Sequence, residues 1–294
     1  MSQGDLSVQE QEDQQTVRRW GLGAAVQFWT WRSGFARRRS EQEARQATPR
    51  SVPAPIAVVR NILAVAEKEI RSYFVSPVAW VVTAVFIAMW GFLFGIIIPG
   101  SREANFRPVL NNFSVTFLLA GPLLTMRLVA EEAKTGTLEL LLTQPLREVE
   151  LVLGKYLGSV VFLLFMLGMT LYFPGLLEKF GNPDEGPLLA GYLGVLLQGM
   201  AFLAIGLMMS ALTQNQIIAA AITFVSLLLL WLSDALARVV GGVAAQVAQY
   251  MSVTKRFEDM PRGVIDTKDI IFFLTIIAAC LFITTQVISA RRWR

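Results

Sequence analysis

The fold is decided by residues 78–98, VAWVVTAVFIAMWGFLFGIII, a run of 21 residues without a single charge. A helix of about 20 apolar residues crosses the hydrocarbon core of a bilayer, which is about 30 Å thick. Backbone N–H and C=O groups find no water there, so a spanning segment of this kind has to satisfy them within a helix. The run therefore predicts a transmembrane helix.

Five further apolar runs have a similar length, and they cover residues 110–129, 151–174, 188–212, 216–237 and 270–289. The second span is the weakest because polar, charged or helix-breaking residues interrupt it, namely Asn111, Asn112, Gly121, Pro122 and Arg127. A membrane β-barrel would instead show alternating strands of about ten residues. The sequence predicts an all-α polytopic membrane protein with six transmembrane helices.

The composition agrees with this fold and excludes several classes of chemistry. Hydrophobic residues make up 54% of the chain and charged residues only 16%, whereas soluble domains carry about 25% charged residues. There is no histidine, and the one cysteine, Cys280, lies in the last apolar run. This rules out an intrachain disulfide, the usual zinc and iron–sulfur ligand sets, and histidine-based catalysis. The sequence therefore predicts no catalytic residue, no metal site and no cofactor.

The chain also lacks the means to power transport by itself. Gly154-Lys155 is followed by Tyr156 rather than Ser or Thr, so no phosphate-binding loop is formed. The ionisable residues nearest the spans, Arg127, Lys155 and Asp234, are predicted at span ends, whereas ion-coupled transporters keep such groups deep in the bundle. Transport would need an ATPase on a separate chain.

Residues 1–55 are predicted to form a basic, mostly disordered cytosolic tail, and residues 56–294 the membrane domain. Within the tail, Trp20–Trp31 either lies on the bilayer surface or is unstructured. With the N-terminus in the cytosol, eighteen of the 26 Lys and Arg residues fall on the cytosolic side, so the positive-inside rule favours two cytosolic termini. This basic charge suits membrane lipid, and nucleic acid is not an expected partner.

The residues before the first span predict an amphipathic helix along the membrane surface. Apolar residues recur at helical spacing on one face: Ile62, Ala66, Ile70, Tyr73 and Phe74. The opposite, polar face carries Glu67, Lys68, Glu69, Arg71 and Ser72. Pro77 lets the chain turn into the first span.

The loop between the second and third spans, residues 127–150, is rich in charge and is either a surface that faces another protein or a solvated loop. Within it, Leu138, Leu141 and Leu142 predict a short helix with an apolar face, and such exposed faces usually have a partner. The third span follows with Gly154 and Gly158 in a G-x-x-x-G pattern, as Gly91 and Gly95 are in the first span. The pattern permits close helix approach, although glycine-rich spans often contain it without an interface.

Several stretches together resemble the ABC-2 type transporter permeases, including those of gliding-motility, sodium-export and copper-maturation systems. They are AEKEIRSYFVSPVAWV (66–81), PLLTMRLVAEEAKTGTLELLLTQPLREVELVLGKYLG (122–158), FLAIGLMMSALTQNQIIAA (202–220), RGVIDTKDIIFF (262–273) and the terminal RRWR. The resemblance extends over about residues 60–294, and it is specific because these stretches occur in combination.

The resemblance implies a non-catalytic permease subunit of an ATP-driven exporter in the prokaryotic cytoplasmic (inner) membrane. The implied partners are a separate ABC ATP-binding subunit, in two copies, and a second permease that is either the same chain or a related one. In such exporters the loop after the second span docks into the ATPase, and a helix before the first span lies along the inner membrane face.

Carried over to this sequence, the resemblance assigns a coupling element to Glu131, Glu132, Gly136, Thr137, Glu139 and Leu140. It assigns the surface helix and its turn to Glu69, Ser76 and Pro77. The loop carboxylates would pair with cations of the ATPase, and the alternative is that they are merely solvated. A different functional class also remains open, in which the chain is a scaffold that anchors an ATPase to a cell-envelope machine without moving a solute.

Overall fold

A computed structural model describes residues 54–101, 105–142, 146–181 and 183–292. The chain divides into two compact units, Met1–Ala57 and Val58–Arg294, and nearly all of the described residues belong to the second. The predicted disordered tail, including Trp20–Trp31, lies almost wholly outside the described residues.

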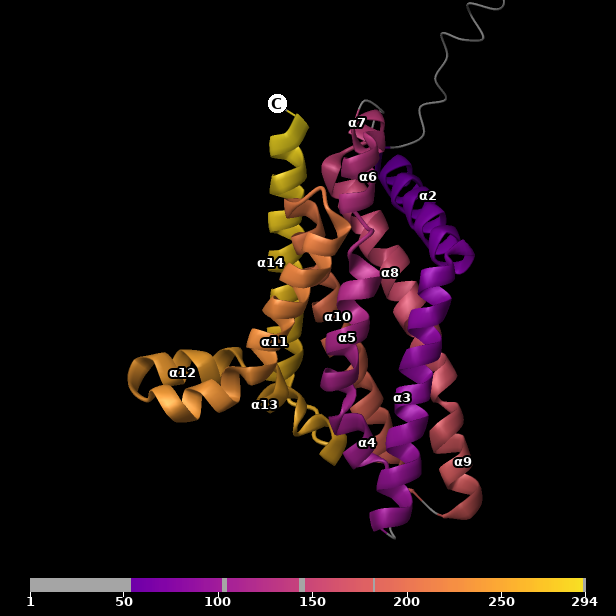
Figure 1. Cartoon of the computed structure of the whole chain (residues 1–294), viewed down its shortest axis with the longest axis vertical. Helices are drawn as coiled ribbons and strands as arrows, with labels where there is room; N and C mark the ends of the chain where they lie inside the picture. Colours follow the sequence, from indigo (N-terminus) through magenta and orange to yellow (C-terminus); the bar gives the residue numbers. More distant parts are fainter. Residues whose placement is uncertain (1–53, 102–104, 143–145, 182, 293–294) are drawn as a thin grey trace, which may run out of the picture. The chain divides into compact units, whose positions relative to one another are not determined.

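Within these ranges the chain is helical and contains no strand (Figure 1). The elements are α2 (Ala54–Val75), α3 (Pro77–Ser101), α4 (Arg107–Asn111), α5 (Phe113–Thr125), α6 (Ala130–Thr135), α7 (Thr137–Leu142), α8 (Glu148–Thr170), α9 (Tyr172–Phe180), α10 (Glu185–Leu212), α11 (Gln216–Val240), α12 (Gly242–Met251), α13 (Val253–Phe257), the 3-10 turn η1 (Met260–Arg262) and α14 (Thr267–Arg292).

The prediction of six membrane-spanning helices is confirmed. Six segments are long and apolar enough to cross a bilayer, and each overlaps one predicted run: Pro77–Gly100, Phe113–Thr135, Glu148–Lys179, Glu185–Leu212, Gln216–Val239 and Thr267–Arg291. The second of these is not one continuous helix, because α5 ends at Thr125 and α6 begins at Ala130. The same segment was the weakest of the predicted spans.

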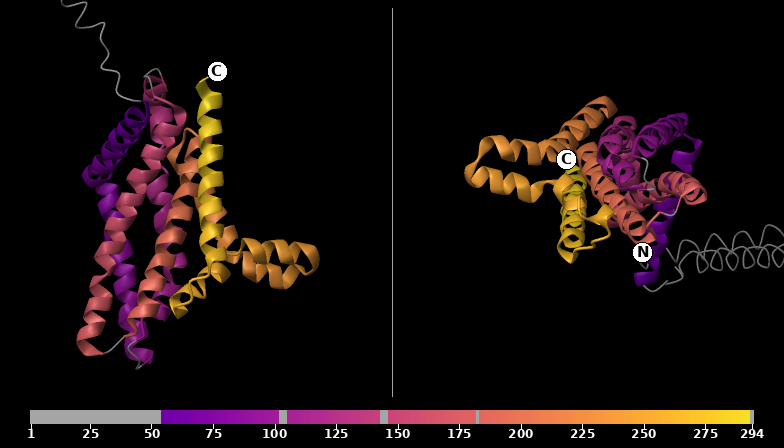
Figure 2. Two further views of the ribbon diagram at one scale, coloured as in Figure 1. Left: turned by 180° about the vertical axis from the view of Figure 1, so that it is seen from behind. Right: turned by 90° about the horizontal axis from the view of Figure 1, so that it is seen from below.

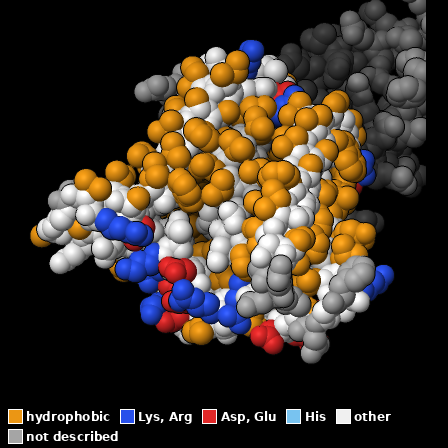
Figure 3. All heavy atoms as spheres, turned by 60° about the horizontal axis from the view of Figure 1, so that its bottom comes forward, with side chains coloured by type: hydrophobic (Ala, Val, Ile, Leu, Met, Phe, Trp, Pro, Cys, Tyr) orange, Lys and Arg blue, Asp and Glu red, His pale blue; other side chains and the backbone are white. Residues whose placement is uncertain are grey.

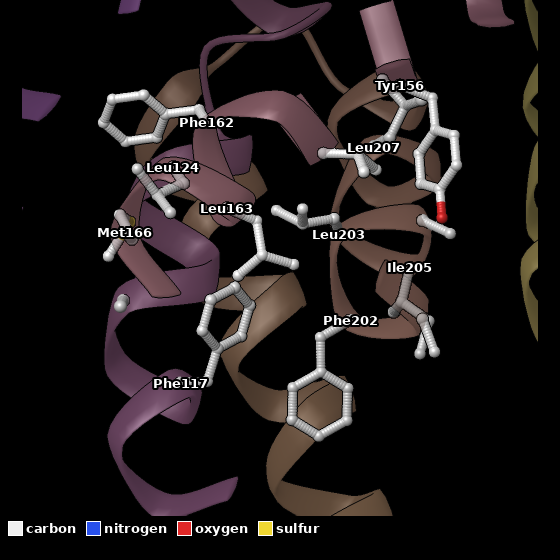
Figure 4. Close-up of a cluster of buried hydrophobic side chains, with 14 of the residues drawn as sticks. Phe117, Leu124, Tyr156, Phe162, Leu163, Met166, Phe202, Leu203, Ile205 and Leu207 are labelled. Carbon is white, nitrogen blue, oxygen red and sulfur yellow. The ribbon is translucent and has the colours of Figure 1, made fainter. Parts of the chain in front are cut away.

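Helix α10 lies at the centre of the bundle, where it packs against α5, α8, α11 and α14. In the second and fourth spans 72% of the most apolar window is buried, against 22% in the first, fifth and sixth. In the core, Phe117 of α5, Leu163 of α8 and Phe202 and Leu203 of α10 lie close together (Figure 4). Lipid tails are as apolar as these side chains, so the hydrophobic effect does little to hold the helices together. The core stabilises the bundle through close van der Waals packing instead.

Helices α2, α6 and α7 lie at the same end of the bundle as the C-terminal end of α14, and α4 and α9 lie at the other end (Figures 1 and 2). Helix α12 packs against α11 and projects to one side. A three-residue link, Thr213–Asn215, makes α10 and α11 a tight hairpin, and the Asn215 side chain caps α11 by accepting from Ile217 N at 2.9 Å. Hydrophobic side chains dominate the face seen in Figure 3, and charged ones gather toward one of its edges.

Candidate functional site

The predicted coupling element forms two short helices that meet at a glycine. Helix α6 ends at Gly136, whose φ of 73° is in the left-handed region that residues with a side chain rarely adopt. Helix α7 follows immediately from Thr137. The hydroxyls of Thr135 and Thr137 lie 2.9 Å apart across this bend and stabilise it.

Directly behind α6 lies a cluster of four charges, formed by Lys68 and Glu69 of α2, Glu132 of α6 and Lys155 of α8. Lys155 Nζ donates to Glu69 Oε1 at 2.7 Å and lies 2.9 Å from Glu132 Oε2. Lys68 Nζ donates to Glu132 Oε1 at 2.5 Å. The Lys155 side chain is only 1% exposed, so its positive charge is buried. The carboxylates of Glu69 and Glu132 beside it neutralise this charge.

The cluster forms because α2 approaches α8 at two glycines. A Cβ on Gly154 would lie 2.5 Å from Val65 Cβ, and one on Gly158 would lie 2.6 Å from Glu69 Cβ. Both distances are impossible for real atoms, so α2 occupies the space that the two missing side chains leave. The G-x-x-x-G pattern at Gly154 and Gly158 therefore marks a real interface, while a Cβ on Gly95 would meet nothing within 4 Å.

The structure corrects the sequence prediction that put Glu69 on the polar face of the surface helix. Glu69 is only 7% exposed, and it lies on the same face of α2 as the buried Val65 and Ala66. On that face Tyr73 also points inward and donates to Leu124 O of α5 at 3.0 Å. The prediction was wrong because a hydropathy pattern places every carboxylate on the solvent-facing side of a helix. It contains no information about the buried cation that neutralises Glu69, which is Lys155.

A second polar contact joins the turn after α2 to the end of the second span. Arg127 Nη1 donates to Ser76 Oγ at 2.7 Å, and Arg127 Nε lies 3.4 Å from Glu131 Oε2. Pro77 opens α3 directly after this turn, as predicted. The two sets of charges share one cleft of about 170 Å³, which lies between α2, α8 and the segment from α5 to α6.

Other residues of the predicted coupling element face outward. Gly136, Thr137 and Glu139 are exposed, and Leu140 is 66% exposed. Leu138 is 3% exposed, so the predicted apolar face that includes it is turned partly into the chain. The exposed surface of α7 thus combines the carboxylate of Glu139 with the large apolar side chain of Leu140.

Lys68, the exposed cation of the cluster, remains charged at neutral pH. Partial burial opposes the charged form of Lys68, but the hydrogen bond and charge of Glu132, together with Glu69, outweigh it and hold the pKa of Lys68 above its ordinary value. Lys68 therefore keeps its positive charge, and its ion pair, throughout the neutral range.

The sequence reasoning missed Lys155, which it treated as a residue at the end of a span. Lys155 is the eighth residue of α8 and is fully enclosed. The neighbouring glycines could have indicated its burial. A lysine between Gly154 and Gly158 lies at the point where another helix comes closest to α8. A buried ammonium at such a place needs a carboxylate from that helix.

A comparison with protein-family models identifies the family of the chain. Among the described residues no group of cysteine and carboxylate side chains could hold a metal ion. A search of curated proteins found no match. A family model described as ABC-2 family transporter protein matches residues 63–292, which include all six spans, α6 and α7 and most of α2. The chain belongs to the ABC-2 transporter family and is a multi-pass membrane subunit without an ATPase domain, which implies an ABC ATPase as its partner.

Proposed function

We propose that the chain is the permease subunit of an ATP-driven exporter and passes the effect of ATP hydrolysis on a separate subunit to a substrate in the membrane. Two ATPase subunits and a second permease would complete the transporter. Family membership supports the ATPase partner. The proposal places α2, α6, α7 and both termini in the cytosol of a prokaryotic cell, with the spans in its cytoplasmic membrane.

The observation that carries this proposal is the exposed bend of α6 and α7 at one end of the bundle, backed by buried ion pairs to α2 and α8. A docking element needs an accessible outer surface and a rigid support. Thr137, Glu139 and Leu140 supply the outer surface and Gly136 the bend, while Glu131 and Glu132 bind cations of this same chain behind it. The ATPase would contact Glu139 and Leu140 first.

The test is to reverse the charge of Glu139. The variant Glu139→Arg should lower the amount of ATPase that co-purifies with the tagged chain by at least about tenfold, because reversal of one charge in a desolvated contact typically costs more than 1.4 kcal/mol. The measurement is quantitative co-purification in mild detergent, with the amount of inserted permease as reference.

The matched control is Glu178→Arg, since Glu178 is exposed on α9 at the other end of the bundle. This variant should keep the full amount of ATPase. Equal ATPase recovery in the two variants would contradict a docking role for the α6–α7 bend.

A further inference from the structure

The cluster of Lys68, Glu69, Glu132 and Lys155 joins three elements that are far apart in the sequence. Glu132 belongs to the proposed docking element, Glu69 and Lys68 to α2, and Lys155 to a membrane-spanning helix. The side chains of Glu69, Glu132 and Lys155 are 9%, 12% and 1% exposed. The cluster is neutral as a whole, and Lys155 is the member that connects the membrane-spanning helix to the other two elements, since it contacts Glu69 of α2 and Glu132 of α6.

We propose that Lys155 is a positioning residue that makes α6, α2 and α8 move as one body when the ATPase displaces the docking element. This inference rests on the proposed function. It adds the path by which a displacement of the α6–α7 bend is transmitted to the rest of the chain. That path runs from Glu132 through Lys155 to Glu69, and from there along the whole of α2.

Electrostatics and packing both support a rigid connection. Separating either carboxylate from Lys155 would leave an ammonium group on a side chain that is only 1% exposed with one neutralising carboxylate instead of two, which is unfavourable where so little water can replace it. A displacement of α6 therefore pulls Lys155 and Glu69 with it rather than breaking the pairs. Since Gly154 and Gly158 seat α2 directly against α8, the two helices have no free space in which the movement could be lost.

The cleft beside the cluster offers a place to observe this movement. Ser72 of α2 is exposed and lines the same cleft as Glu132 and Lys155. Cys280 is the only cysteine of the chain, so the variant Cys280→Ala provides a background without thiols. In that background Ser72→Cys reports the exposure of α2 through the rate at which a maleimide modifies it.

The experiment uses the full chain with its ATPase, reconstituted in lipid and compared with and without ATP plus vanadate. The parent should show a change of about fivefold or more in the modification rate at position 72, the lower end of typical coupling between sites. The double variant Lys155→Met with Glu69→Gln removes one charge of each sign and leaves the Lys68–Glu132 pair in place. It should retain the ATPase but lose most of the nucleotide-dependent change, because the Lys68–Glu132 pair that remains between α6 and α2 has a lysine side chain that is 54% exposed and is the weaker connection.

A matched control removes a different pair of opposite charges from α2. Glu67 and Arg71 form an exposed ion pair at 2.6 Å, and the variant Glu67→Gln with Arg71→Met should respond to nucleotide as the parent does. If Lys155→Met with Glu69→Gln fails to insert, Glu132→Gln replaces it, because this change weakens the connection at the docking element and keeps the Lys155–Glu69 pair.

The outcomes separate the two proposals. Retention of the parent's full nucleotide response by the cluster variant would overturn the role of Lys155, and so would a parent whose position 72 does not respond although the ATPase is bound. Failure of the ATPase to bind the parent would instead overturn the proposed function, and this inference with it.

Discussion

At the scale of single residues, the position of α2 depends on the absence of a side chain at Gly154 and at Gly158. Each glycine leaves a space that Val65 or Glu69 fills, and this contact brings Glu69 within reach of Lys155. A glycine inside a helix costs about 0.5–1 kcal/mol relative to alanine, so these two glycines lower the local helix propensity of α8. The gain is the close contact between two helices and the ion pairs that this contact allows.

One prediction follows for Gly154. The variant Gly154→Ala should lower the free energy of unfolding by about 1–3 kcal/mol, because its Cβ would overlap Val65 Cβ and approach Ile62 O to 2.9 Å. Gly168 of the same helix is the control, since a Cβ there would meet nothing within 4 Å. Gly168→Ala should therefore leave stability unchanged or raise it slightly. Thermal unfolding in detergent measures both, and equal effects would contradict the close contact.

At the scale of elements, the break in the second span is stabilised by α10. Backbone N–H groups are left without intrahelical partners where α5 ends and α6 begins. The Ser210 hydroxyl of α10 accepts from Val129 N and Ala130 N, each at 3.1 Å, and donates to Met126 O at 3.2 Å. One fully buried side chain thus holds the start of α6 against the central helix of the bundle.

Loss of this hydroxyl should loosen the element as a whole. Ser210→Ala should lower the free energy of unfolding by about 2 kcal/mol, since two buried N–H groups lose their acceptor. Limited proteolysis should then cut the α6–α7 bend faster than in the parent. The control is Ser226→Ala, whose hydroxyl bonds only to Ile222 O in its own helix at 2.8 Å. Equal cleavage rates for the two variants would show that Ser210 does not hold the break.

At the scale of the whole membrane unit, an even number of spans places α2 and the C-terminal end of α14 on one side of the bilayer. The structure agrees, because both lie at the same end of the bundle and α9 lies at the other (Figure 1). The distribution of Lys and Arg predicts that the end with α2 faces the cytosol. The orientation of the chain in the membrane is thus predicted from the Lys and Arg residues of its loops, whereas the number of spans is predicted from the apolar length of its helices.

Thiol labelling of intact cells tests this orientation. In the Cys280→Ala background, a membrane-impermeant maleimide should label Glu178→Cys in intact cells, because Glu178 is exposed on the predicted outer side. Ser72→Cys should be labelled only after the membrane is permeabilised. The reverse pattern would place the α6–α7 bend outside the cell and out of reach of a cytosolic ATPase.

The amino-acid sequence alone was enough to predict the helical class, the number of spans and the approximate place of each. These properties depend on local hydropathy, because a continuous apolar segment of about 20 residues has one favourable state in a bilayer. It also located the charged loop between the second and third spans and the G-x-x-x-G pattern of Gly154 and Gly158. Family resemblance, rather than any pattern of charge, supplied the candidate residues of that loop.

Only the tertiary structure decided which of these charges are buried and what they contact. Glu69 and Lys155 are 86 positions apart, and no periodicity within α2 or α8 shows that their side chains meet. The same holds for Ser210, which bonds backbone groups about 80 residues away. The physical reason is that hydropathy depends on a residue's own neighbours in the sequence, whereas a buried charge or an open N–H is stabilised by whichever distant helix is packed against it.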